Sequence, residues 1–102
     1  MAENRRSSTR HVVDLAASVV QNGAATQHKM QNLSLGGALI EMPRLPMGVR
    51  VTVKFALPTF EEPIETAATV RWATETAIGV QFDGLRAKDV WALNKFFEQL
   101  SR

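Results

Sequence analysis

A short stretch of the sequence carries polar residues and glycines at a spacing that suits a small-ligand site. Within residues 30–42, the order Asn32-x-Ser34-x-x-Gly37 separates two apolar runs. The Asn32 amide offers two donors and one acceptor, and the Ser34 hydroxyl can donate or accept. Gly36 and Gly37 remove both side chains at the bend, so a ligand could approach the main chain closely. Taken alone, the stretch favours an Asx turn with a glycine bulge over a ligand site.

Three arginines gather near the start of the chain. Arg5, Arg6 and Arg10 fall within the first ten residues, where only Glu3 opposes their charge. The chain as a whole is nearly balanced, with twelve Lys and Arg residues against ten Asp and Glu residues. This local concentration of charge predicts an arm that attracts anions, and a solvated basic tail is the alternative interpretation.

The two groups together resemble the signature motifs of a known family. Arg6-x-x-x-Arg10 followed by Asn32-x-Ser34-x-x-Gly37 is similar to the motif pair of the PilZ family, whose members bind the bacterial second messenger cyclic di-GMP. Each motif alone is common, but their order, their separation and the strands that follow strengthen the resemblance. It covers nearly the whole chain, from the arginines to the final helix.

The resemblance implies that the arginines contact the ligand. Cyclic di-GMP presents two guanines and two phosphodiesters. A guanidinium can donate to guanine O6 and N7 or to phosphate oxygens, and its flat face can stack on a base. The resemblance further implies that an arm carrying Arg6 and Arg10 closes over ligand lying on the barrel. It also implies that Arg5 influences how many ligand molecules bind.

The resemblance implies roles for the second motif as well. Asn32 would contact a guanine edge, and Ser34 a phosphate or a guanine. Gly36 and Gly37 would leave the turn open for close approach of the ligand. Many family members have Asp where this chain has Asn32. Because an amide carries no charge, its pairing with guanine N–H groups is expected to be weaker than that of a carboxylate.

Apolar periodicity predicts the elements that hold these motifs. Residues 1–11 predict a flexible arm, and residues 12–102 predict one domain of strands followed by a helix. The dipeptide Asn22-Gly23 predicts a hairpin turn. The predicted strands cover residues 12–20, 25–33, 38–42, 50–57, 64–72 and 78–82. Six short strands at this spacing indicate a mainly β fold, a small six-stranded antiparallel β-barrel with one C-terminal α-helix over about residues 86–100. The resemblance implies that this barrel is PilZ-like.

The apolar periodicity predicts different surroundings for the two tryptophans. Alternation from Ile64 to Trp72 predicts that Trp72 faces the core and that Arg71 lies on the polar face, where it meets solvent, with a ligand contact as the alternative. In the helix, Trp91 lies off the apolar stripe and is predicted to pack on a neighbouring loop, with a partner or dimer contact as the alternative. The apolar stripe is made by Val90, Leu93, Phe96, Phe97 and Leu100.

Composition excludes several classes of function. The 102 residues suit one domain, and 45% hydrophobic content suits a single core. With no cysteine and two histidines, no disulfide framework and no metal site are expected. The sequence has no apolar stretch near the length of a bilayer span and no signal-like start, so a cytoplasmic protein is expected.

The resemblance implies a cyclic di-GMP receptor or adaptor, which is expected to order its arm on binding and to signal through an unidentified downstream protein. No cofactor and no enzymatic activity are expected, because neither histidine accompanies a recognisable nucleophile motif. The alternative is a PilZ-fold protein-interaction adaptor that does not bind nucleotide. Binding of RNA or single-stranded DNA ranks third, because the net charge is only +2 and there is no tyrosine.

Overall fold

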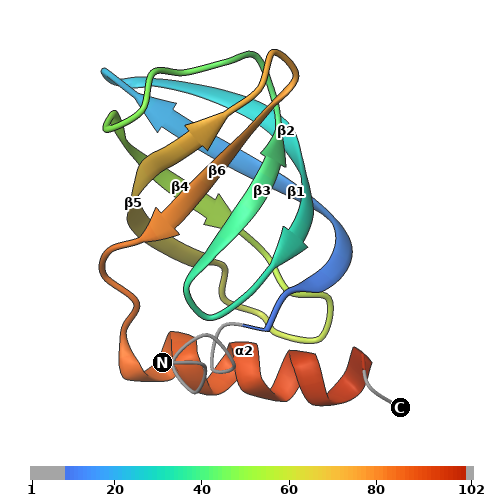
Figure 1. The fold of residues 1–102 in the computed structure, drawn as a ribbon. Helices are drawn as coiled ribbons and strands as arrows, with labels where there is room; N and C mark the ends of the chain where they lie inside the picture. Colours follow the sequence, from blue (N-terminus) through green and yellow to red (C-terminus); the bar gives the residue numbers. More distant parts are fainter. Residues whose placement is uncertain (1–8, 101–102) are drawn as a thin grey trace, which may run out of the picture.

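A computed structural model describes residues 9–100 of the chain. Its six strands, counted over those residues, close into an antiparallel barrel in the order β1-β2-β3-β6-β5-β4, and a helix crosses one end (Figure 1). The strands are β1 (His11–Gln21), β2 (Ala24–Leu33), β3 (Gly37–Glu41), β4 (Arg50–Phe55), β5 (Ile64–Ala73) and β6 (Ala77–Phe82), and the helix is α2 (Ala87–Leu100). The predicted fold class is confirmed. No helix among residues 9–100 is long and apolar enough to cross a membrane.

The first hairpin forms where the sequence predicts it. Asn22 and Gly23 have φ values of 53° and 81°, so both residues adopt the left-handed conformation that a type I′ turn requires. The turn joins Gln21 to Ala24, which are paired across β1 and β2. The hairpin sets the register of these two long strands, and β2 in turn carries Asn32 to the far end of the barrel.

The barrel core follows the predicted alternation over most of its length. In β4, Val51, Val53 and Phe55 are all buried, and the residues between them face outward. In β5 the residues from Ile64 to Val70 alternate in the same way. The core is therefore a single apolar cluster inside the barrel, which α2 covers at one end.

The alternation breaks at the end of β5, and the prediction for Trp72 is wrong. Val70 pairs with Val80 and Trp72 pairs with Gly79, so two steps along β5 match one step along β6. Arg71 is thus the extra residue of a β-bulge, which turns the following side chain to the other face. Trp72 is 39% exposed on the outside of the barrel instead of buried in the core.

Helix α2 packs on the barrel through the middle of its predicted stripe. Leu93, Phe96 and Phe97 are buried, whereas Leu100 at the helix end is 44% exposed, contrary to the prediction. Leu100 is the last residue of α2, and its side chain is left in solvent there. The prediction for Trp91 is confirmed, because its ring meets that of Phe60 in the β4–β5 loop edge-on at 5.9 Å.

The start of α2 is fixed by charged residues. The Asp89 carboxylate is buried and accepts hydrogen bonds from the Arg86 backbone N–H at 3.0 Å and from its Nε at 3.2 Å. This pairing closes the first turn of the helix. Lys88 Nζ also donates to Glu62 Oε1 at 2.8 Å, and this contact lowers the pKa of Glu62. The helix is thereby tied to the β4–β5 loop by its first turn.

Candidate functional site

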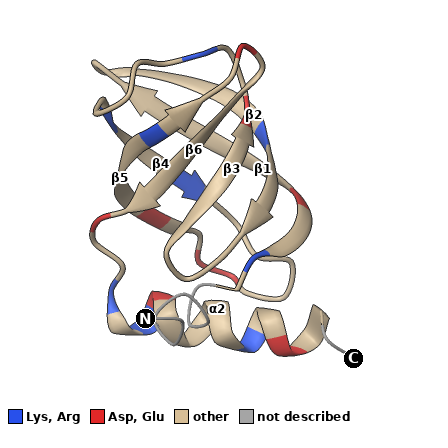
Figure 2. Ribbon diagram, viewed as in Figure 1, with Lys and Arg blue, Asp and Glu red and all other residues tan. Residues whose placement is uncertain are grey.

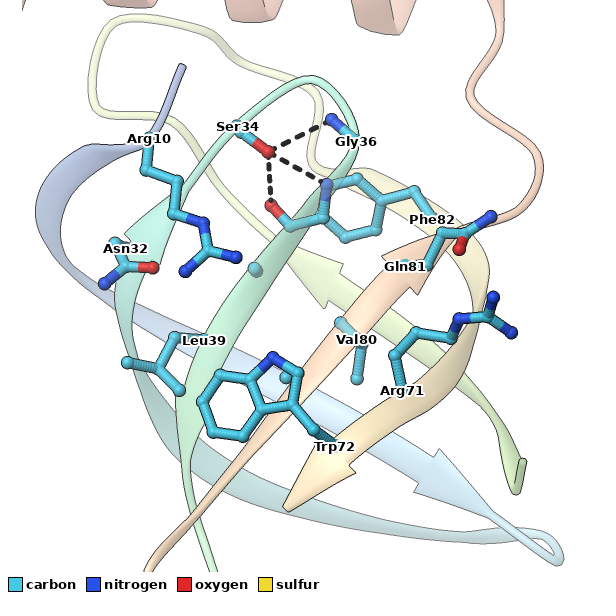
Figure 3. A pocket seen from close by; sticks show the side chains of 13 residues that line it. Arg10, Asn32, Ser34, Gly36, Leu39, Arg71, Trp72, Val80, Gln81 and Phe82 are labelled. Carbon is cyan, nitrogen blue, oxygen red and sulfur yellow. Dashed lines mark hydrogen bonds between the residues drawn. The ribbon is translucent and has the colours of Figure 1, made fainter. Parts of the chain in front are cut away.

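A cavity of about 730 Å³ lies over the outer face of β3 and β6 (Figure 3). Its wall combines the residue just before β1, the β2–β3 turn and the bulged end of β5. The lining residues are Arg10, Asn32, Ser34, Gly36, Gly37, Ala38, Leu39, Arg71, Trp72, Gly79, Val80, Gln81 and Phe82. Residues far apart in the sequence therefore meet at one site because the barrel closes between them.

The structure brings five of the seven predicted site residues to this cavity. Arg10 comes from the end of the predicted arm, while Asn32, Ser34, Gly36 and Gly37 come from β2 and the turn after it. In Figure 3, the Arg10 and Asn32 side chains lie next to each other at one side of the cavity.

The other two predicted site residues, Arg5 and Arg6, lie outside the described residues. Their proposed contacts with a ligand therefore stay predictions.

Ser34 builds the turn between β2 and β3. Its Oγ accepts hydrogen bonds from the N–H groups of Gly36 and Gly37, each at 3.1 Å, and donates to the Gly37 carbonyl at 3.3 Å. A hydroxyl has one proton and two acceptor positions, so the turn uses the whole hydrogen-bonding capacity of Ser34. The side chain that caps this turn is thus the serine, and not the asparagine that an Asx turn would use.

Gly37 is required by the barrel itself. A Cβ at this position would clash with the Val80 carbonyl oxygen, because β6 runs directly beside β3 here. The motif resemblance implies that this glycine leaves room for a ligand. The structure gives a different physical reason, since the missing side chain lets two neighbouring strands pair.

Trp72 forms a flat apolar surface in the cavity. A Cβ at Gly79 would clash with the indole, so the ring lies directly on the β6 backbone at its paired residue. Sequence reasoning missed Trp72 as a site residue because it assumed unbroken alternation in β5. The signal that was present is Gly79 itself, a residue without a side chain on the outward face of β6.

The polar side chains of the cavity have hydrogen-bonding groups to spare. Arg10, Asn32, Arg71 and Gln81 have no side-chain hydrogen bond to another described residue. The lining residues include two guanidinium groups and no carboxylate. Elsewhere, Lys and Arg are spread over the barrel and α2 rather than gathered on one face (Figure 2). The cavity therefore suits a compact anion with flat groups better than a long polyanion.

These features place the chain in a known class of β-barrel. Residues 4–99 match the PilZ domain family, and the chain belongs to that family. PilZ domains generally bind cyclic di-GMP. No curated protein sequence matches the chain.

Two solved structures have a similar fold. The inhibitor of motility MotI/DgrA of Bacillus subtilis superposes with a TM-score of 0.82 at 23% identity, over 96% of this chain and 53% of that one. This chain thus spans about half the length of MotI/DgrA. The PilZ domain of CeSA from a cellulose-synthesizing bacterium superposes with a TM-score of 0.72 at 16% identity, over 93% of this chain and 100% of that one.

Proposed function

We propose that the protein is a receptor for cyclic di-GMP and that the ligand binds in the cavity over β3 and β6. The observation that carries the proposal is the meeting of Arg10, Asn32 and Trp72 at one cavity, although they are far apart in the sequence. A barrel that needed only a stable hairpin at residues 34–37 would have no use for an arginine from another element beside that turn.

The chemistry of the lining matches the chemistry of the ligand. The guanidinium groups of Arg10 and Arg71 can offset the charge of the two phosphodiesters and donate to their oxygens. The Asn32 amide can pair with a guanine edge. The exposed face of Trp72 can stack on a base, an interaction that contributes about 1–3 kcal/mol in single-stranded nucleic acid complexes.

Ser34 and Gly37 support the site indirectly in this proposal. Because the turn already uses the Ser34 hydroxyl, a direct contact with phosphate would require the loss of a turn hydrogen bond. We assign both residues to the placement of the turn and of β3, which form one wall of the cavity. The roles in ligand contact then fall to Arg10, Asn32, Arg71 and Trp72.

In this proposal, the receptor signals through the ordering of its N-terminal arm. Binding recruits Arg6, and Arg5 beside it, to a ligand that Arg10 already faces. Fixing the backbone of each arm residue costs on the order of 1–2 kcal/mol, so part of the ligand's interaction energy is spent on ordering. The ordered arm then presents a new surface to a downstream protein. Amide exchange of residues 4–11 is expected to slow on addition of ligand.

Calorimetric titration with cyclic di-GMP tests the proposal. The wild type should bind, and Arg10→Ala should lose about 1–3 kcal/mol of binding free energy, the range for a bidentate contact with guanine. Arg44→Ala is the matched control, because Arg44 is an exposed arginine that does not line the cavity. A wild type that binds no better than Arg10→Ala would support the alternative, a protein-interaction adaptor that does not bind nucleotide.

A further inference from the structure

The first residue of β1 carries a ring that lies on α2. The imidazole of His11 stacks on the phenyl ring of Phe97, with centroids 4.1 Å apart and planes 14° apart. Phe97 is only 8% exposed and belongs to the core cluster, so its ring is held by the helix and the barrel end. The stack therefore fastens the start of β1 to a fixed surface.

The residue before the stack lines the cavity. Arg10 directly precedes His11, and successive side chains of an extended chain point to opposite sides. When His11 lies on α2, Arg10 is directed away from the helix and toward Asn32, as Figure 3 shows. The stacking of His11 thus determines the direction in which the Arg10 guanidinium extends.

Strand pairing restrains this end of β1 on one side. The strand pairs with β4 only from Ala17 onward, so residues 11–16 have β2 as their sole paired neighbour among the described strands. Pairing with β2 is itself irregular between Val12 and Leu15. Val12 is 86% exposed and adds no packing of its own. Val13 and Leu15 pack against the core further along the strand, and the His11–Phe97 stack is the aromatic contact that holds its first residue.

We propose that His11 is a positioning residue for the ligand site and that its stack on Phe97 couples the cavity to α2. The inference rests on the proposed function. If the stack favours the Arg10 position that binds ligand, then ligand must favour the stack by the same factor, because coupling between two equilibria is reciprocal. Ligand in the cavity would then tighten the docking of α2, although α2 lines no part of the cavity.

Three variants test the coupling by calorimetry with cyclic di-GMP. Aromatic pairs contribute about 0.5–1.5 kcal/mol, so His11→Ala should weaken the affinity by about twofold to twelvefold. His11→Phe keeps a stacking ring and should restore the affinity. Val12→Ala, at the exposed neighbouring position, should bind as the wild type does. If His11→Ala does not fold, His11→Gln removes the ring while keeping a polar side chain.

Amide exchange separates this inference from the proposed function. Without ligand, residues 9–16 should exchange faster in His11→Ala than in the wild type and His11→Phe. With ligand, exchange of α2 should slow in the wild type and in His11→Phe but not in His11→Ala. Wild-type affinity in His11→Ala, or equal slowing of α2 in that variant, would overturn the inference. A wild type that does not bind would overturn the proposed function, while the ligand-free exchange would still test the anchor.

Discussion

The two tryptophans of the protein stand at its surface in opposite surroundings. Trp72 is 39% exposed and lies flat on the backbone at Gly79, inside a cavity with two arginines. Trp91 is 58% exposed, but its ring meets Phe60 edge-on and has the Lys95 ammonium 5.9 Å from its centroid. Trp91 is thus the more exposed of the two, yet its ring already contacts an aromatic and a cationic side chain of the protein.

The difference shows that exposure alone does not identify a binding residue. Around Trp72 the barrel lacks a side chain at Gly79, and polar groups without partners among the described residues converge on the space above the ring. Around Trp91, a phenylalanine of the β4–β5 loop and a lysine of α2 contact the ring. An exposed aromatic ring is a candidate ligand-stacking surface where it lies on backbone without a side chain and where charged groups surround it.

The largest effect is expected from a side chain at a glycine of the cavity region. Gly37→Ala should lower the free energy of unfolding by more than about 3 kcal/mol, because the new Cβ would clash with the Val80 carbonyl and force β3 from β6. Gly84→Ala, on the side of the helix, is the control, since its Cβ would meet only Thr66 Oγ1 at 3.8 Å. Equal stability of the two variants in urea would show that the cavity region is no more tightly packed than the helix region.

A tryptophan exchange sharpens the comparison directly. Trp72→Ala should weaken cyclic di-GMP binding by about 1–3 kcal/mol through the loss of stacking, while Trp91→Ala should leave it unchanged. In Trp91→Phe, Trp72 is the sole tryptophan of the chain, and its fluorescence should change on titration with ligand. Equal losses of affinity in the two alanine variants would remove the distinction drawn between the two rings.

The smallest effect is expected from a pair of hydroxyl deletions. Ser34→Ala leaves the N–H groups of Gly36 and Gly37 without their acceptor and should lower the unfolding free energy by about 1–2 kcal/mol. Thr59→Ala removes an exposed hydrogen bond to Gln99 and should change it by less than about 0.5 kcal/mol. Chemical denaturation measures both. A neutral Ser34→Ala would mean that the turn does not depend on its serine.

Most of the barrel could be predicted because its signals are local. The Asn22-Gly23 turn and the alternation in β4 depend on neighbouring residues in the chain, and both are confirmed. The bulge at Arg71 could not be found in this way, because it arises from the pairing of β5 with β6. The same holds for Gly37, whose missing Cβ matters only because Val80 lies on the next strand.

The part of the candidate site that the two motifs contain could be predicted from the sequence. The arginine and the Asn-x-Ser-x-x-Gly pattern indicated five residues that do line one cavity. Trp72 was assigned to the core and Arg71 to solvent because alternation in β5 was taken as unbroken. The role of Ser34 depends on a backbone geometry that residue types do not reveal. The motifs thus indicated where the cavity lies, whereas the place of the Trp72 ring in it depends on strand pairing that the motifs do not contain.

The bulge in β5 has a consequence for how the outer surface of such a barrel can change. Side chains alternate between the two faces of a strand, so an extra residue in a bulge places the side chains that follow on the face opposite to the one expected from unbroken alternation. If Arg71 paired regularly with Gly79, Trp72 would lie opposite Ile78 and face the interior of the barrel. In this fold, an irregularity in strand pairing decides what the exterior can hold as firmly as the identity of any residue in the strand.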